Sequence, residues 1–136
     1  MTVPSTLHRF VADDGVGLVY REWGAEHASN GRPPVVLHHG FLVDAVVNWE
    51  LPGIVDLLVG AGHRVIAIDA RGHGRSDKPH DPARYGEARM AADLHDLFDH
   101  LGLDQVDLVG YSMGAVVALV AASTSGTRGR IRRLVV

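Results

Sequence analysis

Apolar residues fall into short runs along this chain, and turn-forming residues separate the first two runs. Residues 7–12 and 18–23 are β-prone stretches, and between them lie Asp13, Asp14 and Gly15, which are typical of a hairpin turn. The pattern therefore predicts a leading antiparallel pair of strands. Residues 35–37 form a continuous apolar run without alternation, which predicts a strand covered on both faces. Further strands are predicted at residues 65–68, 106–109 and 134–136.

Three segments between these runs have the spacing of helices. Residues 49–61 carry apolar positions at helical intervals, with Pro52 in the first turn. Residues 91–101 combine an apolar face with an acidic and histidine-rich face that we expect to be exposed. Residues 113–123 are apolar nearly all round, which predicts a buried helix.

Strands that alternate with helices after an initial hairpin indicate the α/β fold class. Right-handed crossovers would then give a mostly parallel sheet with helices on both faces. The chain contains no internal repeat, low-complexity tract or linker that would divide it. We therefore expect residues 1–136 to form a single unit.

Composition and charge exclude several classes of protein. Of the 136 residues, 46% are hydrophobic and 21% are charged, which is typical of a globular chain. The net charge of −3 provides no positive field for nucleic acid. The longest apolar run, residues 115–122, is too short to span a bilayer, and residues 1–10 lack the apolar core of a signal peptide. We expect a cytoplasmic protein with no nucleic-acid partner.

The strongest chemical signal is a G-x-S-x-G motif between a predicted strand and a predicted helix. It consists of Gly110, Tyr111, Ser112, Met113 and Gly114. The two glycines would let strand and helix approach, while Ser112 is pushed outward on a strained backbone. Such motifs also occur by chance in glycine-rich loops, but the strand-to-helix position favours a serine nucleophile.

A second signal lies at His38, His39, Gly40 and Phe41, directly after the third predicted strand. A loop at this place could present a backbone N–H toward the serine, and Gly40 would let the backbone turn inward. We predict an oxyanion hole formed by the amides of Phe41 and Met113. The alternative is a plain strand-terminating turn with buried histidines.

No cofactor and no metal ion are predicted. Residues 69–76 contain no complete dinucleotide-binding glycine motif, and the chain has neither a P-loop nor a zinc-protease helix motif. Arg71 and Arg75 could bind an anion, but we expect them to be solvated or paired with Asp69 and Asp77.

Three motifs in sequence order resemble those of the α/β-hydrolase superfamily. They are HHGF at residues 38–41, DARGHGRSDKP at 69–79 and GYSMG at 110–114. The resemblance implies that the chain contains strands 1 to 6 of that fold, at residues 7–12, 18–23, 35–37, 65–68, 106–109 and 132–136. It would then be an incomplete α/β-hydrolase fold.

The resemblance also implies roles for individual residues. Ser112 takes the position of the nucleophile, and Phe41 and Met113 take the oxyanion positions. His39 and Gly40 shape the oxyanion loop, while Gly110, Tyr111 and Gly114 shape the turn around the serine. A serine at this position favours esterase-like acyl transfer over the dehalogenase and epoxide-hydrolase branches, whose nucleophile is an aspartate.

The acid and base of the expected triad are missing from the sequence. Residues 113–136 contain no Asp, Glu or His, although the family places both partners after the serine. We do not expect His38 or His39 to replace the base, because they would approach from the side of the substrate oxygen. The chain alone should be nearly inactive.

Two functions follow from these features. The first is a serine hydrolase for a small-molecule ester or related carbonyl substrate, and the alternative is a non-catalytic small-molecule-binding or regulatory remnant of the same fold. The sequence leaves the substrate and the oligomeric state open.

Overall fold

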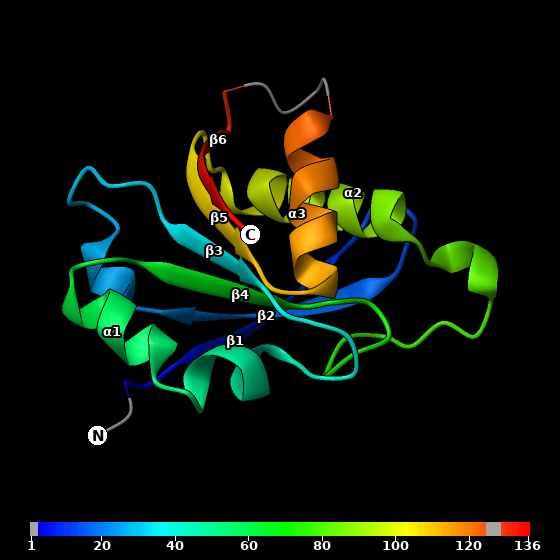
Figure 1. The fold of residues 1–136 in the computed structure, drawn as a ribbon, viewed down its shortest axis with the longest axis horizontal. Coiled ribbons are helices and arrows are strands. Elements are labelled where there is room, and N and C mark those ends of the chain that lie inside the picture. The colour runs from blue at the N-terminus through cyan, green and yellow to red at the C-terminus, as the bar shows by residue number, and fades with distance from the viewer. Residues whose placement is uncertain (1–2, 125–128) are drawn as a thin grey trace.

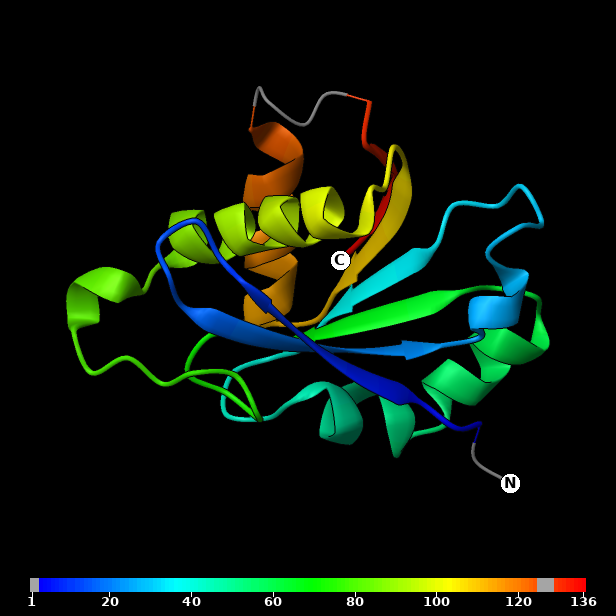
Figure 2. The same cartoon turned by 180° about the vertical axis from the view of Figure 1, so that it is seen from behind.

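A computed structural model of the chain describes residues 3–124 and 129–136. These residues form one six-stranded sheet with helices on both faces (Figures 1 and 2). The strands are β1 (Thr6–Val11), β2 (Gly17–Trp23), β3 (Val35–His38), β4 (Val65–Asp69), β5 (Val106–Gly110) and β6 (Ile131–Val135). The helices are α1 (Ile54–Gly60), α2 (Glu87–Leu101) and α3 (Met113–Ser123), with short helical turns η1 (Ala25–His27), η2 (Val46–Glu50) and η3 (Pro82–Arg84).

The strand order is β1-β2-β4-β3-β5-β6. Strand β2 is antiparallel to both β1 and β4, whereas β4, β3, β5 and β6 run parallel to one another. This arrangement confirms the predicted α/β class with a leading hairpin. His38 at the end of β3 pairs with Ile68 of β4 and with Gly110 of β5. The loops that follow these three strands therefore begin side by side at one edge of the sheet.

Two apolar layers hold the helices on the sheet. On one face, α2 and α3 bury Leu94, Leu97, Phe98 and Val117 against the sheet. On the other face, η2 and α1 cover a smaller core that includes Trp23. The hydrophobic effect of these two layers fixes the sheet between its helices, and so fixes the positions of the loops at its edge.

The helix predicted at residues 49–61 is divided in the structure, so this prediction was wrong in its extent. The π-helical turn η2 ends at Glu50, and α1 begins at Ile54. Pro52 lies between them and cannot donate a backbone hydrogen bond, and Gly53 has a φ of 86°. The apolar spacing continues across this break, because both segments pack on the same face of the sheet.

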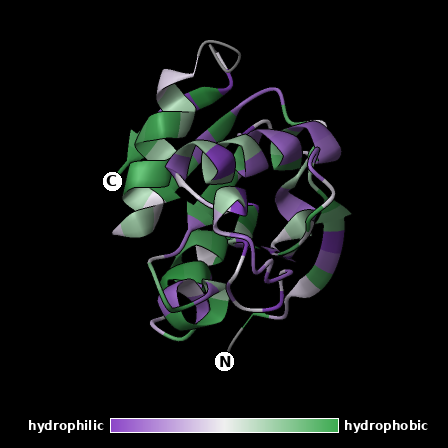
Figure 3. Cartoon of the chain, turned by 90° about the vertical axis from the view of Figure 1, so that its right-hand side faces the viewer, coloured by the Kyte–Doolittle hydropathy of each residue, from purple (hydrophilic) through white to green (hydrophobic). Residues whose placement is uncertain are grey.

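Helix α3 is less buried than its apolar sequence predicts. Val117, Ala118 and Ala121 are buried against the sheet and α2, whereas Val116 and Leu119 are about half exposed. Figure 3 shows that α3 is apolar along most of its length. Within the described residues, only one side of this helix is covered.

Arg71 corrects the prediction that the arginines after β4 are solvated or paired with Asp69 and Asp77. Its side chain is fully buried and donates two hydrogen bonds to Asp93 of α2, both of 2.8 Å. It also donates to Asp14 of the β1–β2 hairpin at 2.8 Å. The Arg71 guanidinium holds the pKa of the Asp14 carboxyl well below its usual range.

Asp93 also corrects the expectation that the whole polar face of its helix is exposed. It is only 2% exposed, because it lies opposite Arg71 in the ion pair. A lone Asp in a helix interior carries no sign of a partner 22 residues away. Asp69 instead accepts hydrogen bonds from the backbone N–H groups of Ala45 and Arg75.

Candidate active site

Ser112 stands at the bend between β5 and α3. Its backbone has a φ of 55° and a ψ of −116°, which a residue with a side chain rarely adopts. Such a conformation costs on the order of 1–3 kcal/mol and persists only when the surrounding fold imposes it. The residue as a whole is exposed. The fold therefore holds Ser112 outward in a fixed place.

The glycines on either side of Ser112 are required by close backbone approach. A Cβ atom at Gly110 would overlap the carbonyl oxygen of Gly114, and a Cβ at Gly114 would overlap the carbonyl oxygen of His38. The Tyr111 N–H donates a 3.1 Å hydrogen bond to the same His38 oxygen. The backbone of the bend therefore packs directly against His38 at the end of β3.

The loop after β3 packs against this bend. A Cβ placed on Gly40 would lie 3.2 Å from the ring of Tyr111 and 3.4 Å from the Cβ of Ser112. Phe41 follows it with an exposed side chain, and Leu42 has a φ of 64°. The backbone of this loop therefore lies beside the serine.

His39 is fully buried, and hydrogen bonds of its two ring nitrogens restrain the loop that follows β3. Its Nδ1 donates to the carbonyl oxygen of Gly40 at 2.7 Å, and its Nε2 accepts a 2.9 Å hydrogen bond from the Ala70 N–H. In a trans peptide the C=O and the next N–H point in opposite directions. Because His39 fixes the Gly40 carbonyl on one side, the Phe41 N–H is directed to the other side.

Asn48 of η2 provides a second restraint that the sequence analysis missed. Its Oδ1 accepts a 2.7 Å hydrogen bond from the Gly40 N–H. Across residues 3–124 and 129–136, no hydrogen bond engages the N–H of Phe41 or of Met113. The structure therefore leaves these two amides available, whereas the N–H groups of Gly40 and Gly114 beside them are bonded. Asn48 belongs to no motif, and only the packing of η2 brings it to the loop.

His38 and His39 are both buried beneath the loop rather than exposed beside Ser112. His38 is 1% exposed, and burial lowers its pKa to about 3, while its Nδ1 donates to the His39 carbonyl. Burial also lowers the pKa of His39. Both rings are engaged in hydrogen bonds beneath the loop.

Acidification is expected to destabilise the fold through these histidines. His38 binds a proton at pH 6.5 when unfolded but only near pH 3 when folded, so stability rises with pH across this window and is lost as the pH falls. Between pH 6.5 and about pH 4.5, His38 alone should remove about 2 kcal/mol from the free energy of unfolding. Urea unfolding over a pH series measures this loss.

The matched variants for this series are His38→Leu and His80→Leu, since His80 is exposed. The first should flatten the dependence on pH in this window, and the second should leave it unchanged. A wild-type slope in His38→Leu would contradict the assignment to His38.

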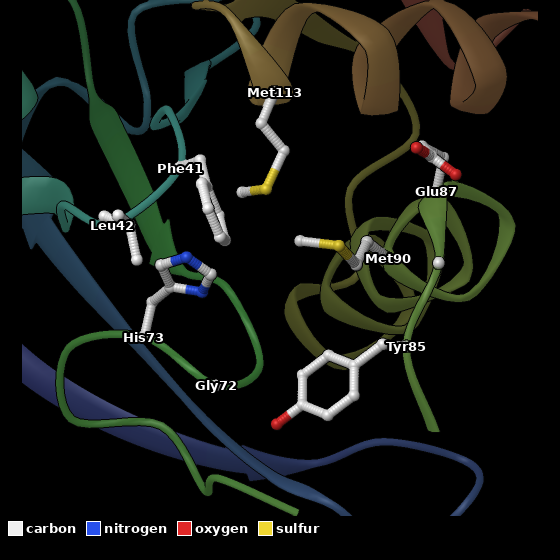
Figure 4. A pocket seen from close by; sticks show the side chains of 9 residues that line it. Phe41, Leu42, Gly72, His73, Tyr85, Glu87, Met90 and Met113 are labelled. Carbon is white, nitrogen blue, oxygen red and sulfur yellow. The ribbon is translucent and has the colours of Figure 1, made fainter. Parts of the chain in front are cut away.

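A cavity of about 420 Å³ opens beside the bend, next to Phe41 and Met113. Figure 4 shows the side chains of Met113 and Met90 reaching into it from α3 and α2, with Phe41 and His73 on the facing side. Tyr85, Glu87, Leu42, Gly72 and Gly86 complete its lining. The volume is in the range of small-molecule sites.

The described residues contain no group of three or more His, Cys, Asp or Glu side chains that could hold a metal ion. In the same part of the chain, no helix has the length and hydropathy needed to cross a bilayer.

A sheet of this topology with a strained serine after its fifth strand defines the class of α/β hydrolases. A family model described as "alpha/beta hydrolase fold" matches residues 33–136, and the chain belongs to this family. Non-heme chloroperoxidase CPO-A1 of Kitasatospora aureofaciens is 38% identical over 90% of this chain and 40% of its own length. Epoxide hydrolase A of Mycobacterium tuberculosis is 37% identical over 80% of this chain and 32% of its own length. The chain thus spans well under half of these relatives.

Solved structures of α/β-hydrolase relatives also superimpose on this chain. Epoxide hydrolase A from Mycobacterium thermoresistibile superimposes with a TM-score of 0.80 at 31% identity, over 96% of this chain and 38% of that one. A thioesterase domain from the curacin biosynthetic pathway gives a TM-score of 0.80 at 27% identity, over 96% of this chain and 43% of that one.

Proposed function

We propose that this chain carries the nucleophile and the oxyanion hole of a serine hydrolase for an ester or a related small carbonyl compound. The observation that carries the proposal is the strained, exposed Ser112 beside two backbone amides that have no hydrogen-bond partner within the described residues. Relatives named as epoxide hydrolases and haloperoxidases share the scaffold. A serine hydroxyl, unlike a carboxylate, favours attack on an acyl carbon.

In the proposed reaction the Oγ of Ser112 forms a bond to the substrate carbonyl carbon, and the hydroxyl proton passes to a base. The carbonyl oxygen becomes an oxyanion, which the N–H groups of Phe41 and Met113 would bind. Met113 opens α3, so the positive end of the helix macrodipole adds to this stabilisation. The bond to the leaving oxygen then breaks as the base returns its proton to that oxygen, which departs as the alcohol. Water hydrolyses the remaining acyl-serine to the carboxylic acid and free Ser112.

Residues 113–136 supply neither the base nor its carboxylate partner, since they contain no Asp, Glu or His. A serine hydrolase without its histidine loses on the order of 10⁶ in turnover. We therefore propose that residues 1–136 bind and orient the carbonyl group but have almost no activity alone.

Labelling with a fluorophosphonate probe tests the proposal on the intact gene product that contains residues 1–136. We expect covalent label on one peptide, with the modification at Ser112 by mass spectrometry. An unlabelled protein, or a label on another serine in the presence of a free Ser112, would overturn the assignment.

The second candidate function is that of a non-catalytic small-molecule binder. The cavity lined by Phe41, Met90 and Met113 favours it, because it offers an apolar binding site whether or not Ser112 reacts. Binding of an apolar fluorophore in the cavity without any fluorophosphonate labelling of Ser112 would support this alternative.

A further inference from the structure

The geometry points to a substrate whose buried part is apolar and carries a hydrogen-bond donor or a positive charge, and it points to exclusion of carboxylates. This inference rests on the proposed function, because it names the substrate class of the same site. It follows from the polar side chains that line the cavity beside Ser112, those of His73, Tyr85 and Glu87, each of which can accept a hydrogen bond.

His73 presents an acceptor to the cavity. Its Nδ1 lies 3.0 Å from the carbonyl oxygen of Arg71. A carbonyl oxygen only accepts hydrogen bonds, so Nδ1 carries a proton, and in this tautomer the lone pair is on Nε2. The ring lies against Phe41, with 5.7 Å between the ring centroids, on the cavity wall shown in Figure 4.

Tyr85 presents a second acceptor. Its hydroxyl donates a 2.7 Å hydrogen bond to the carbonyl oxygen of Pro79, so the phenol proton is already committed. The phenol oxygen keeps lone pairs for a donor from the substrate. Gly72 lets the ring lie close to the loop after β4, because a Cβ there would come within 2.8 Å of the ring.

Glu87 places a negative charge at the edge of the cavity (Figure 4). Within the described residues, its carboxylate has no ion-pair partner. In the part of the chain that the structure describes, no lysine or arginine lines the cavity. Arg89 on the same helix pairs instead with Asp13, Asp93 and Asp96.

The remaining wall is apolar and accommodates a hydrocarbon group. Met90 is buried, and its side chain meets the space opposite Phe41. A carboxylate in this cavity would lose hydration next to thioethers and would face Glu87, with no cation to compensate. A hydroxyl, an amide N–H or an ammonium group would instead find acceptors on His73, Tyr85 and Glu87.

Four 4-nitrophenyl esters of phenylacetic acid test this inference on the intact gene product. Their para substituents are methyl, hydroxymethyl, aminomethyl and carboxylate, which are similar in size and differ in charge and donor capacity. We expect the carboxylate ester to have a kcat/KM about tenfold or more below that of the methyl ester. The hydroxymethyl and aminomethyl esters should at least equal the methyl ester.

Variants assign the selectivity to particular side chains. Glu87→Gln should raise the carboxylate-to-methyl ratio of kcat/KM by about threefold, since an exposed charge acts weakly. His73→Phe should lower the hydroxymethyl-to-methyl ratio. Glu26→Gln is the matched control, because Glu26 is an exposed acid in the first turn of η1 outside the cavity, and it should change neither ratio.

The outcomes separate this inference from the proposed function. Fluorophosphonate labelling of Ser112 with equal kcat/KM for all four esters, or with a preference for the carboxylate ester, would overturn the substrate class alone. An unchanged carboxylate-to-methyl ratio in Glu87→Gln would remove the role of Glu87 in it. Failure of the probe to label Ser112 would overturn the proposed function and the substrate class together.

Discussion

Ser112→Ala is expected to reduce kcat/KM of the intact gene product toward an aryl ester by on the order of 10⁶, because the substitution removes the atom that forms the covalent bond. The alanine keeps the Cβ and the positive φ of 55° at the bend, so the fold should not change. Steady-state hydrolysis of a 4-nitrophenyl ester, with urea unfolding of the same sample, measures both effects.

Ser123→Ala provides the matched control for this result. Ser123 ends α3 and is exposed, and its hydroxyl donates to the Val120 carbonyl. The control should hydrolyse the ester at the wild-type rate. Wild-type hydrolysis by Ser112→Ala would show that the activity arises elsewhere in the molecule.

The second large effect concerns His39, whose two ring nitrogens have different partners. A glutamine places its amide near the position of Nε2 and would leave the Gly40 carbonyl without its donor. We expect His39→Gln to lower kcat by about 10²–10³ with little change in KM, because an oxyanion donor acts in the transition state. Steady-state kinetics with an ester substrate measure the two constants separately.

His39→Asn is the complementary variant, since an asparagine amide can occupy the position of Nδ1 and still donate to Gly40. It should keep most of kcat but lose stability, because the Ala70 N–H is then buried without an acceptor, at a cost of about 1–3 kcal/mol. Equal losses of kcat in the two variants would show that His39 is only structural.

Much of the fold could be predicted because its signals are local. β-prone stretches and short apolar runs indicated every strand, and the hairpin residues near Gly15 indicated the antiparallel start. The break at Pro52 and Gly53 was missed, since the apolar spacing continues across it. The buried pair of Arg71 and Asp93 was also missed, because an ion pair between distant elements leaves no pattern in the sequence.

The residues of the candidate site also fall into two groups, those that the sequence predicted and those that it did not. Ser112 and the loop at Gly40 lie in contiguous motifs, whose glycines are explained by the close approach of backbones. Asn48, Tyr85 and Glu87 come from separate elements and meet the site only through tertiary packing. The apolar spacing of α2 accounts for Met90 as a core residue, so its place in the cavity had no separate signal.

The orientation of two amides toward the serine oxygen is the central claim, and a crystal structure of the intact gene product with a phosphonate bound to Ser112 measures it directly. The account predicts the phosphoryl oxygen at about 2.7–3.1 Å from the backbone nitrogens of both Phe41 and Met113. A phosphoryl oxygen that is bound by other groups, with these two N–H groups directed away from it, would contradict the account.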